Sequence, residues 1–126
     1  MKTGALATSG VWETFGITVV GANERDMASA VNRVSRLGGG IVLYAEGRVQ
    51  AELSLPIGGI MSPLPLETVA EKLLAINQKA KELGFIFADA PLTLAVLTTP
   101  AIPFLRISEE GIVDLKRSQV VDLVVR

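Results

Sequence analysis

The sequence predicts a single α+β domain with a mixed β-sheet and two main helices packed on it. Three observations indicate this fold class: short segments with the apolar or alternating pattern of strands, two long segments with apolar residues at helical spacing, and a length of 126 residues. That length suits one compact unit, so residues 1–126 are expected to form one domain. Apolar residues make up 49% of the chain, enough to build a core.

The N-terminal part predicts two strands and a helix. Residues 5–9 form a short candidate strand, and residues 17–20 have the β-branched pattern of a buried strand. Asn23 is a favourable N-cap, with Asp26 placed to reach back to it, and Gly38 ends the helix. The apolar face of this helix consists of Met27, Ala30, Val31, Val34 and Leu37.

A β-hairpin is predicted next, with strands at 41–44 and 48–53 joined by a turn at Glu46-Gly47. Strict alternation predicts that Val49, Ala51 and Leu53 share one face of the second strand. A loop rich in proline and glycine follows at 56–65, and its apolar stretch 57–61 is unusual for a solvated loop.

A second helix is predicted at 66–83 and ends at Gly84. Its apolar stripe consists of Leu66, Val69, Leu73, Ile76, Ala80 and Leu83. Residues 92–98, between two prolines, have the pattern of a further strand. Three short apolar runs follow around a Glu110-Gly111 turn, at 104–107, 112–115 and 120–125.

The composition excludes several kinds of chemistry. The chain has no histidine and no cysteine, so by itself it offers no imidazole, thiolate or disulfide. We expect no metal site and no cofactor in this chain. The absence of cysteine fits a reducing cytosol, and a cytoplasmic location is expected.

Charge and hydropathy narrow the expected partners. The net charge is −1 without a basic patch, which argues against nucleic acid. No apolar run reaches the roughly 18 residues that a membrane helix needs. The excess of aliphatic residues in so short a chain suggests burial against a partner, with a densely packed monomer as the alternative. Ile57, Ile60 and Met61 are the candidate partner interface.

Two glycine-containing segments raise the question of anion binding. Gly38-Gly39-Gly40 follows a helix and precedes a strand, the wrong end for a phosphate cradle, so a helix C-cap is favoured. Gly21-Ala22-Asn23 lies at the right end but lacks the remaining motif residues, and simple capping is favoured over an anion site.

No catalytic residue is predicted. The carboxylate pairs Glu24 with Asp26, and Glu109 with Glu110, are typical of surface positions at a helix start and a turn. The hydroxyls of Ser9, Thr14 and Ser62 cannot form a triad without an imidazole, and a serine–lysine pair has no local signature.

One aromatic–polar cluster near the N-terminus is a candidate ligand-binding site. It consists of Trp12, Glu13, Thr14 and Phe15. The alternative is a loop anchored by two aromatic rings.

Several segments in order along the chain resemble the C-terminal domain of adenine deaminases. The matching segments are 21–33, 37–42, 51–62, 71–73, 92–94 with Pro100, Ile102 and Pro103, and 111–114. The resemblance covers nearly the whole chain with compatible spacing. It departs where family members usually read His-Asp-Ser-His-Asn, because this chain reads Trp12-Glu13-Thr14-Phe15-Gly16.

The resemblance implies that chemistry takes place elsewhere. In that family, a TIM barrel that binds Mn or Fe hydrolyses adenine to hypoxanthine and ammonia. A barrel needs about 200 residues or more, which this chain cannot hold. We therefore expect a structural or assembly module, non-catalytic alone, that associates with a separate deaminase barrel or forms a homo-oligomer. A stand-alone module that binds a purine-like molecule is the alternative, and a small enzyme that uses only carboxylates is a weaker third.

Overall fold

The computed structural model describes residues 1–12, 16–99, 101, 104–108 and 110–121, and it has seven strands and three helices within those ranges. The first group of elements is β1 (Ala5–Thr8), β2 (Thr18–Gly21), α1 (Glu24–Arg36), β3 (Gly40–Ala45), β4 (Arg48–Ser54) and α2 (Leu66–Glu82). The second group is α3 (Ala90–Leu97), β5 (Leu105–Ser108), β6 (Gly111–Asp114) and β7 (Gln119–Val121). The predicted α+β class is confirmed.

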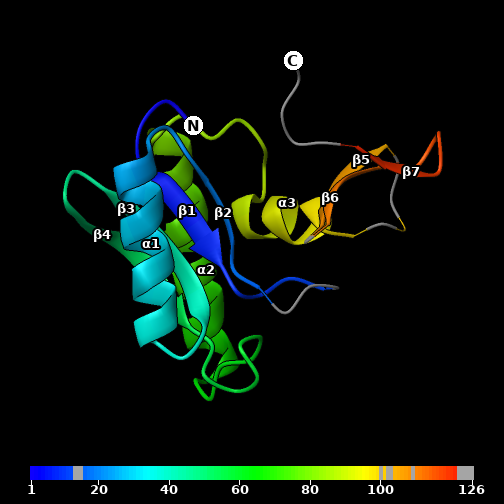
Figure 1. Ribbon diagram of the computed structural model, residues 1–126. Coiled ribbons are helices and arrows are strands. Elements are labelled where there is room, and N and C mark those ends of the chain that lie inside the picture. The colour runs from blue at the N-terminus through cyan, green and yellow to red at the C-terminus, as the bar shows by residue number, and fades with distance from the viewer. Residues whose placement is uncertain (13–15, 100, 102–103, 109, 122–126) are drawn as a thin grey trace.

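The strands form two sheets in place of the single mixed sheet that we expected. Four strands pair in the order β2-β1-β3-β4, and three pair in the order β5-β6-β7. Every pairing between these strands is antiparallel. Figure 1 shows the smaller sheet beyond α3, away from the larger sheet. The sequence pattern locates strands but does not specify the direction in which neighbouring strands pair.

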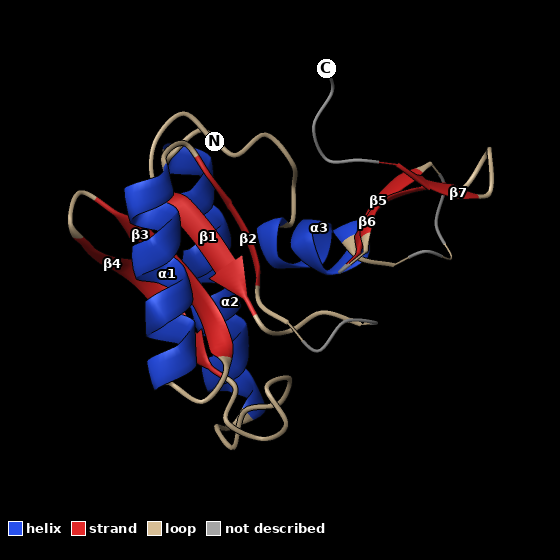
Figure 2. Ribbon diagram, viewed as in Figure 1, coloured by secondary structure: helices blue, strands red, loops and turns tan. Residues whose placement is uncertain are grey.

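The four-stranded sheet is covered on both faces, which gives three layers. Figure 2 shows α1 in front of this sheet and α2 behind it. The α1 layer packs small residues, with Ala5, Ala7 and Ala30 fully buried. On the other face, larger residues from β1, β3 and β4 meet α2 and α3, and this core consists of Leu6, Ile41, Leu43, Leu53, Leu55, Ile76, Ala80, Phe85, Ala90 and Leu94.

The first helix begins and ends as the sequence predicts. Asn23 Oδ1 accepts a hydrogen bond from the Asp26 amide at 2.9 Å, and Asn23 Nδ2 donates to Asp26 Oδ2 at 2.8 Å. At the other end Gly38 has a φ of +72°, and the Gly39 amide donates to the Val34 carbonyl at 3.1 Å. A left-handed residue that ends a helix in this way favours glycine because it has no Cβ. The segments Gly21-Ala22-Asn23 and Gly38-Gly39-Gly40 therefore cap the two ends of α1, as the sequence pattern favoured over anion binding.

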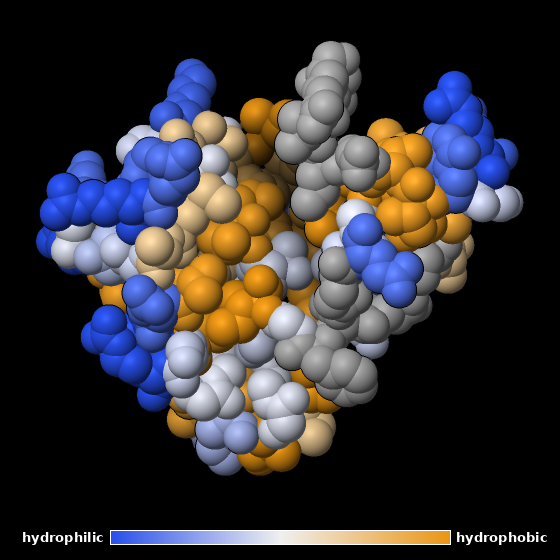
Figure 3. Space-filling model, in the orientation of Figure 1, coloured by the Kyte–Doolittle hydropathy of each residue, from blue (hydrophilic) through white to orange (hydrophobic). Residues whose placement is uncertain are grey.

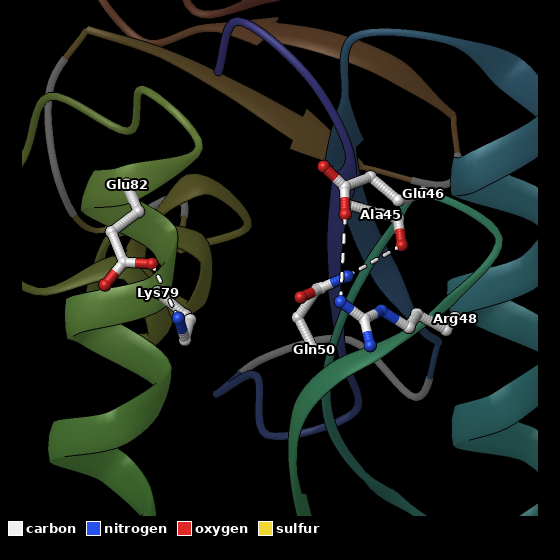
Figure 4. Close-up of polar contacts among 6 residues, drawn as sticks. All are labelled: Ala45, Glu46, Arg48, Gln50, Lys79 and Glu82. Carbon is white, nitrogen blue, oxygen red and sulfur yellow. Dashed lines mark hydrogen bonds and ion pairs between the residues drawn. The ribbon is translucent and has the colours of Figure 1, made fainter.

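A β-bulge corrects the predicted face of Val49. The register of β3 with β4 shifts between Leu43 and Tyr44, which leaves Gln50 as the extra residue. Ala51 packs with the α2 layer, whereas Val49 packs with the α1 layer. An inserted residue reverses the side-chain alternation beyond it. Gln50 Nε2 also donates to the Ala45 carbonyl at 2.9 Å (Figure 4).

Residues 92–97 belong to the helix α3, so the strand predicted at 92–98 is wrong. Asp89 caps α3 by accepting a hydrogen bond from the Leu92 amide at 2.9 Å, and Pro91 lies in the first turn. Both are helix-start signals. A short apolar run cannot be assigned to strand or helix by periodicity alone. In this case Leu94 is fully buried and Ala95 is nearly so, as α3 packs on the sheet beside α2.

Two further expectations are corrected in detail. The strand expected at 17–20 is the half-buried strand β2 (Thr18–Gly21), which lies at the edge of the sheet and pairs, among the described strands, with β1 alone. Leu66 begins α2 with 78% of its surface exposed, although it belongs to the apolar stripe. Among the described residues, no helix is both long and apolar enough to cross a membrane.

Candidate functional site: an open apolar groove

An apolar groove of about 460 Å³ lies between α2, the strands β3 and β4, and the loop that joins β4 to α2. Its floor is formed by Ile41 and Leu53 from the sheet, with Leu55 just after β4. The rest of the lining is Gly10, Ile60, Met61, Ser62, Leu64, Leu66, Val69 and Leu73. The groove is therefore built where the predicted stripe of α2 meets the predicted inward face of the hairpin.

The loop at 56–62 closes on itself and forms the rim of the groove. Ile57 and Met61 exchange backbone hydrogen bonds at 3.2 and 3.1 Å. The two glycines between them, Gly58 and Gly59, have φ values of +62° and +78°, which glycine adopts without strain. The tight turn leaves Ile60 and Met61 each 56% exposed.

Ser9 fixes this loop against the end of the sheet. Its Oγ accepts a hydrogen bond from the Gly40 amide at 2.8 Å and donates one to the Gly59 carbonyl at 2.6 Å. Gly39 approaches the same place so closely that a Cβ there would lie 2.6 Å from the Gly59 Cα. Sequence reasoning considered Ser9 only as a nucleophile and missed this positioning role.

The predicted site residues have different places in the structure. Ile60 and Met61 line the groove, whereas Ile57 is 47% exposed on the same loop without lining it. Trp12 is 63% exposed, two residues after Gly10 in the groove lining. Glu13, Thr14 and Phe15 lie outside the described residues, so the role of this cluster remains a prediction.

The chemistry of the groove favours an apolar contact. Of the residues that line it, all of them described, Ser62 alone has a polar side chain, and none is charged. Recognition of a purine ring needs several convergent hydrogen-bonding groups in addition to apolar walls. An apolar protein segment fits this lining better.

The described charged residues lie outside the groove lining, and several of them form ion pairs at the protein surface. Arg33 on α1 forms two hydrogen bonds with Glu52 on β4, at 2.8 and 2.7 Å. This contact holds the pKa of Glu52 below its ordinary value, mainly through the hydrogen bond, and raises that of Arg33. Figure 4 shows two exposed ion pairs, Lys79 with Glu82 and Arg48 with Glu46. Exposed pairs of this kind contribute little to the free energy of unfolding.

The described residues contain no group of three His, Cys, Asp or Glu residues that could hold a metal ion. Glu24 and Asp26 begin α1, and Asp26 is engaged by the cap. Glu110 donates its amide to Ser108 Oγ at 3.3 Å, while Glu109 lies outside the described residues.

Comparison with known proteins identifies the family. The family model for the adenine deaminase C-terminal domain matches residues 1–119. The chain therefore belongs to this family. It is 40% identical over 121 residues to an adenine deaminase of Brucella abortus (strain 2308), covering 96% of this chain and 21% of that protein.

Adenine deaminases of other bacteria give the same relation. The identity is 41% over 120 residues with Cereibacter sphaeroides and 42% over 120 residues with Methylobacterium sp. (strain 4-46). In each case 95% of this chain matches 21% of the relative. The chain thus spans about a fifth of the length of these relatives, in which the domain is one part of a longer protein.

Proposed function

We propose that this chain is a non-catalytic module that associates with the catalytic part of an adenine deaminase and serves adenine deamination in purine salvage. The open apolar groove, in a domain that forms about a fifth of longer deaminases, is the observation that carries the proposal. The metal and the reaction belong to the other part of such a protein. The rim residues Ile60 and Met61 contact that part.

The energetic reason lies in the exposed side chains of the rim. Ile60 and Met61 each leave 56% of their surface in water, and Leu66 leaves 78%. Burial of apolar surface contributes about 25 cal/mol per Å², so covering three such side chains stabilises a complex by a few kcal/mol. A partner that covers these side chains gives up few hydrogen bonds to water, because Ser62 is, among the described lining residues, the one with a polar side chain. The burial of apolar surface is therefore opposed by little loss of hydrogen bonding.

A chimeric enzyme tests the association. In the Brucella abortus relative, the matching segment of 121 residues is replaced by this chain, and a second version is cut before that segment. The chimera should deaminate adenine and resist thermal inactivation better than the shortened protein. Ile60→Asp should remove that gain, because it would bury a charge in the contact. Leu74→Asp is the matched control, since Leu74 is 70% exposed on α2 outside the groove lining.

An activity assay of the isolated chain tests the non-catalytic role. With added Mn or Fe it should release no ammonia from adenine, and sustained turnover would refute the non-catalytic role. A chimera no more stable than the shortened relative, or equal effects of Ile60→Asp and Leu74→Asp, would refute docking through the groove.

A further inference from the structure

The small sheet β5-β6-β7 lacks a covering layer within the described part of the chain. None of its strands pairs with the larger sheet, and the two hydrophobic cores include no described residue beyond Leu94. Isolated sheets of this size become stable only when a hydrophobic face is packed. Figure 3 shows apolar side chains gathered over this sheet, beside the hydrophilic turn between β6 and β7.

The strand register places an apolar row on one face. Ile107 pairs with Ile112, and Ile112 pairs with Val121, so these three side chains share a face. Leu105 lies two residues before Ile107 and therefore joins them, at an end of the face where it pairs with the polar Asp114. Leu105 is 54% exposed and Ile107 is 46% exposed. We call these four residues, Leu105, Ile107, Ile112 and Val121, the apolar row.

We infer that the apolar row is a second docking surface, covered by the preceding part of an adenine deaminase. This inference rests on the proposed function and adds a contact separate from the groove. The row lies on elements that contribute nothing to the groove lining, so each surface can be disrupted without the other. The two contacts together would hold the domain at two points.

The size of the sheet decides between this partner and a second copy. With strands of three or four residues, one face measures about 14 by 14 Å, or about 200 Å², given a rise of about 3.4 Å and a spacing of about 4.8 Å. A stable complex between free proteins buries about 800 Å² on each side. The row alone is too small to hold a free copy. In the relatives the domain is joined to the rest of the protein, and covalent linkage makes a small contact sufficient.

Hydrogen exchange in the chimera tests this inference directly. Amides of β5 and β6 should exchange about tenfold more slowly in the chimera than in the isolated chain, since covering two half-exposed aliphatic side chains shifts the opening equilibrium by about that factor. The double variant Leu105→Thr/Ile107→Thr should abolish this difference. Threonine retains β propensity while adding a polar group.

Val120→Thr is the matched control on the opposite face. The exposed fraction of Val120, 48%, is similar to the 46% of Ile107. Val120 pairs with Val113 on the face of the sheet opposite the apolar row. It should leave the protection in the chimera unchanged. Equal loss from both faces would mean that the variants only weaken the sheet, and it would overturn the inference.

The remaining outcomes separate the two proposals. Protection that is absent in a chimera stabilised through Ile60 would overturn the inference and leave the proposed function standing. A chimera with no gain over the shortened relative would remove both. A dimer of the isolated chain that Leu105→Thr/Ile107→Thr dissociates, seen by sedimentation, would assign the row to a second copy instead.

Discussion

Replacing Ser9 with alanine should destabilise the whole domain, because this hydroxyl joins the sheet to the rim of the groove. The substitution removes an acceptor at 2.8 Å from the Gly40 amide and a donor at 2.6 Å to the Gly59 carbonyl. Gly40 is buried, so its amide would lose its partner away from water. Leaving a buried hydrogen-bonding group without its partner costs about 1–3 kcal/mol, so we expect a loss of about 2 kcal/mol.

Thermal unfolding followed by circular dichroism measures this loss. For a chain of this size, 1 kcal/mol corresponds to about 4 °C, so Ser9→Ala should lower the midpoint by about 8 °C. Ser29→Ala is the control, because the Ser29 hydroxyl donates only to the exposed Arg25 carbonyl within α1. If Ser9→Ala changes the midpoint no more than Ser29→Ala does, the loop is held by something other than Ser9.

Three further predictions concern local features of the fold. Gly39→Ala should destabilise the domain by at least about 2 kcal/mol in urea unfolding, because the added Cβ would lie 2.6 Å from the Gly59 Cα. Gly38→Ala is the control and should cost about 1 kcal/mol, because a Cβ at Gly38 meets open space and only the left-handed backbone is strained. Similar costs for the two variants would contradict the close approach of Gly39 to Gly59. Asn23→Ala should cost about 1 kcal/mol through loss of the cap, and a neutral result would show that the cap is not needed. The pKa of Glu52 is lowered in the folded state, so this residue stabilises the fold above a pH of about 4.5, its ordinary pKa, and the stabilisation is lost as the pH falls through the lowered pKa. The loss of unfolding free energy on acidification should therefore be smaller in Glu52→Gln than in the unchanged chain. An equal loss in both would contradict the pairing of Glu52 with Arg33.

Local sequence signals predicted the elements that depend on local chemistry. Asn23 and Gly38 delimit α1 by capping and left-handed geometry, and both act over a few residues. The turn at Glu46-Gly47 likewise places both residues at positive φ, as a two-residue hairpin turn requires. Such features need no knowledge of the rest of the chain.

Features that depend on distant contacts could not be predicted in the same way. The bulge at Gln50 leaves no local mark, and it reverses the face of Val49. The helix-start signals Asp89 and Pro91 lie just before segment 92–98, but the apolar run of this segment matched a buried strand equally well. The groove itself joins Gly10, the hairpin and α2, which are far apart in sequence, so the loop residues Ile60 and Met61 could be named but not placed.

The distribution of large apolar residues bears on why the chain is so rich in them. The α1 layer is filled mainly by small side chains, with Ala5, Ala7 and Ala30 fully buried. Large side chains remain exposed in the groove rim and on the small sheet, as Met61 and Leu105 illustrate at 56% and 54%. The layer between the sheet and α2 does bury large residues, among them Leu6, Leu43 and Ile76, so the apolar excess is divided between this core and the described surface. Contiguous apolar groups at a protein surface are typical of contact sites, so we expect a partner to cover the exposed part of the excess.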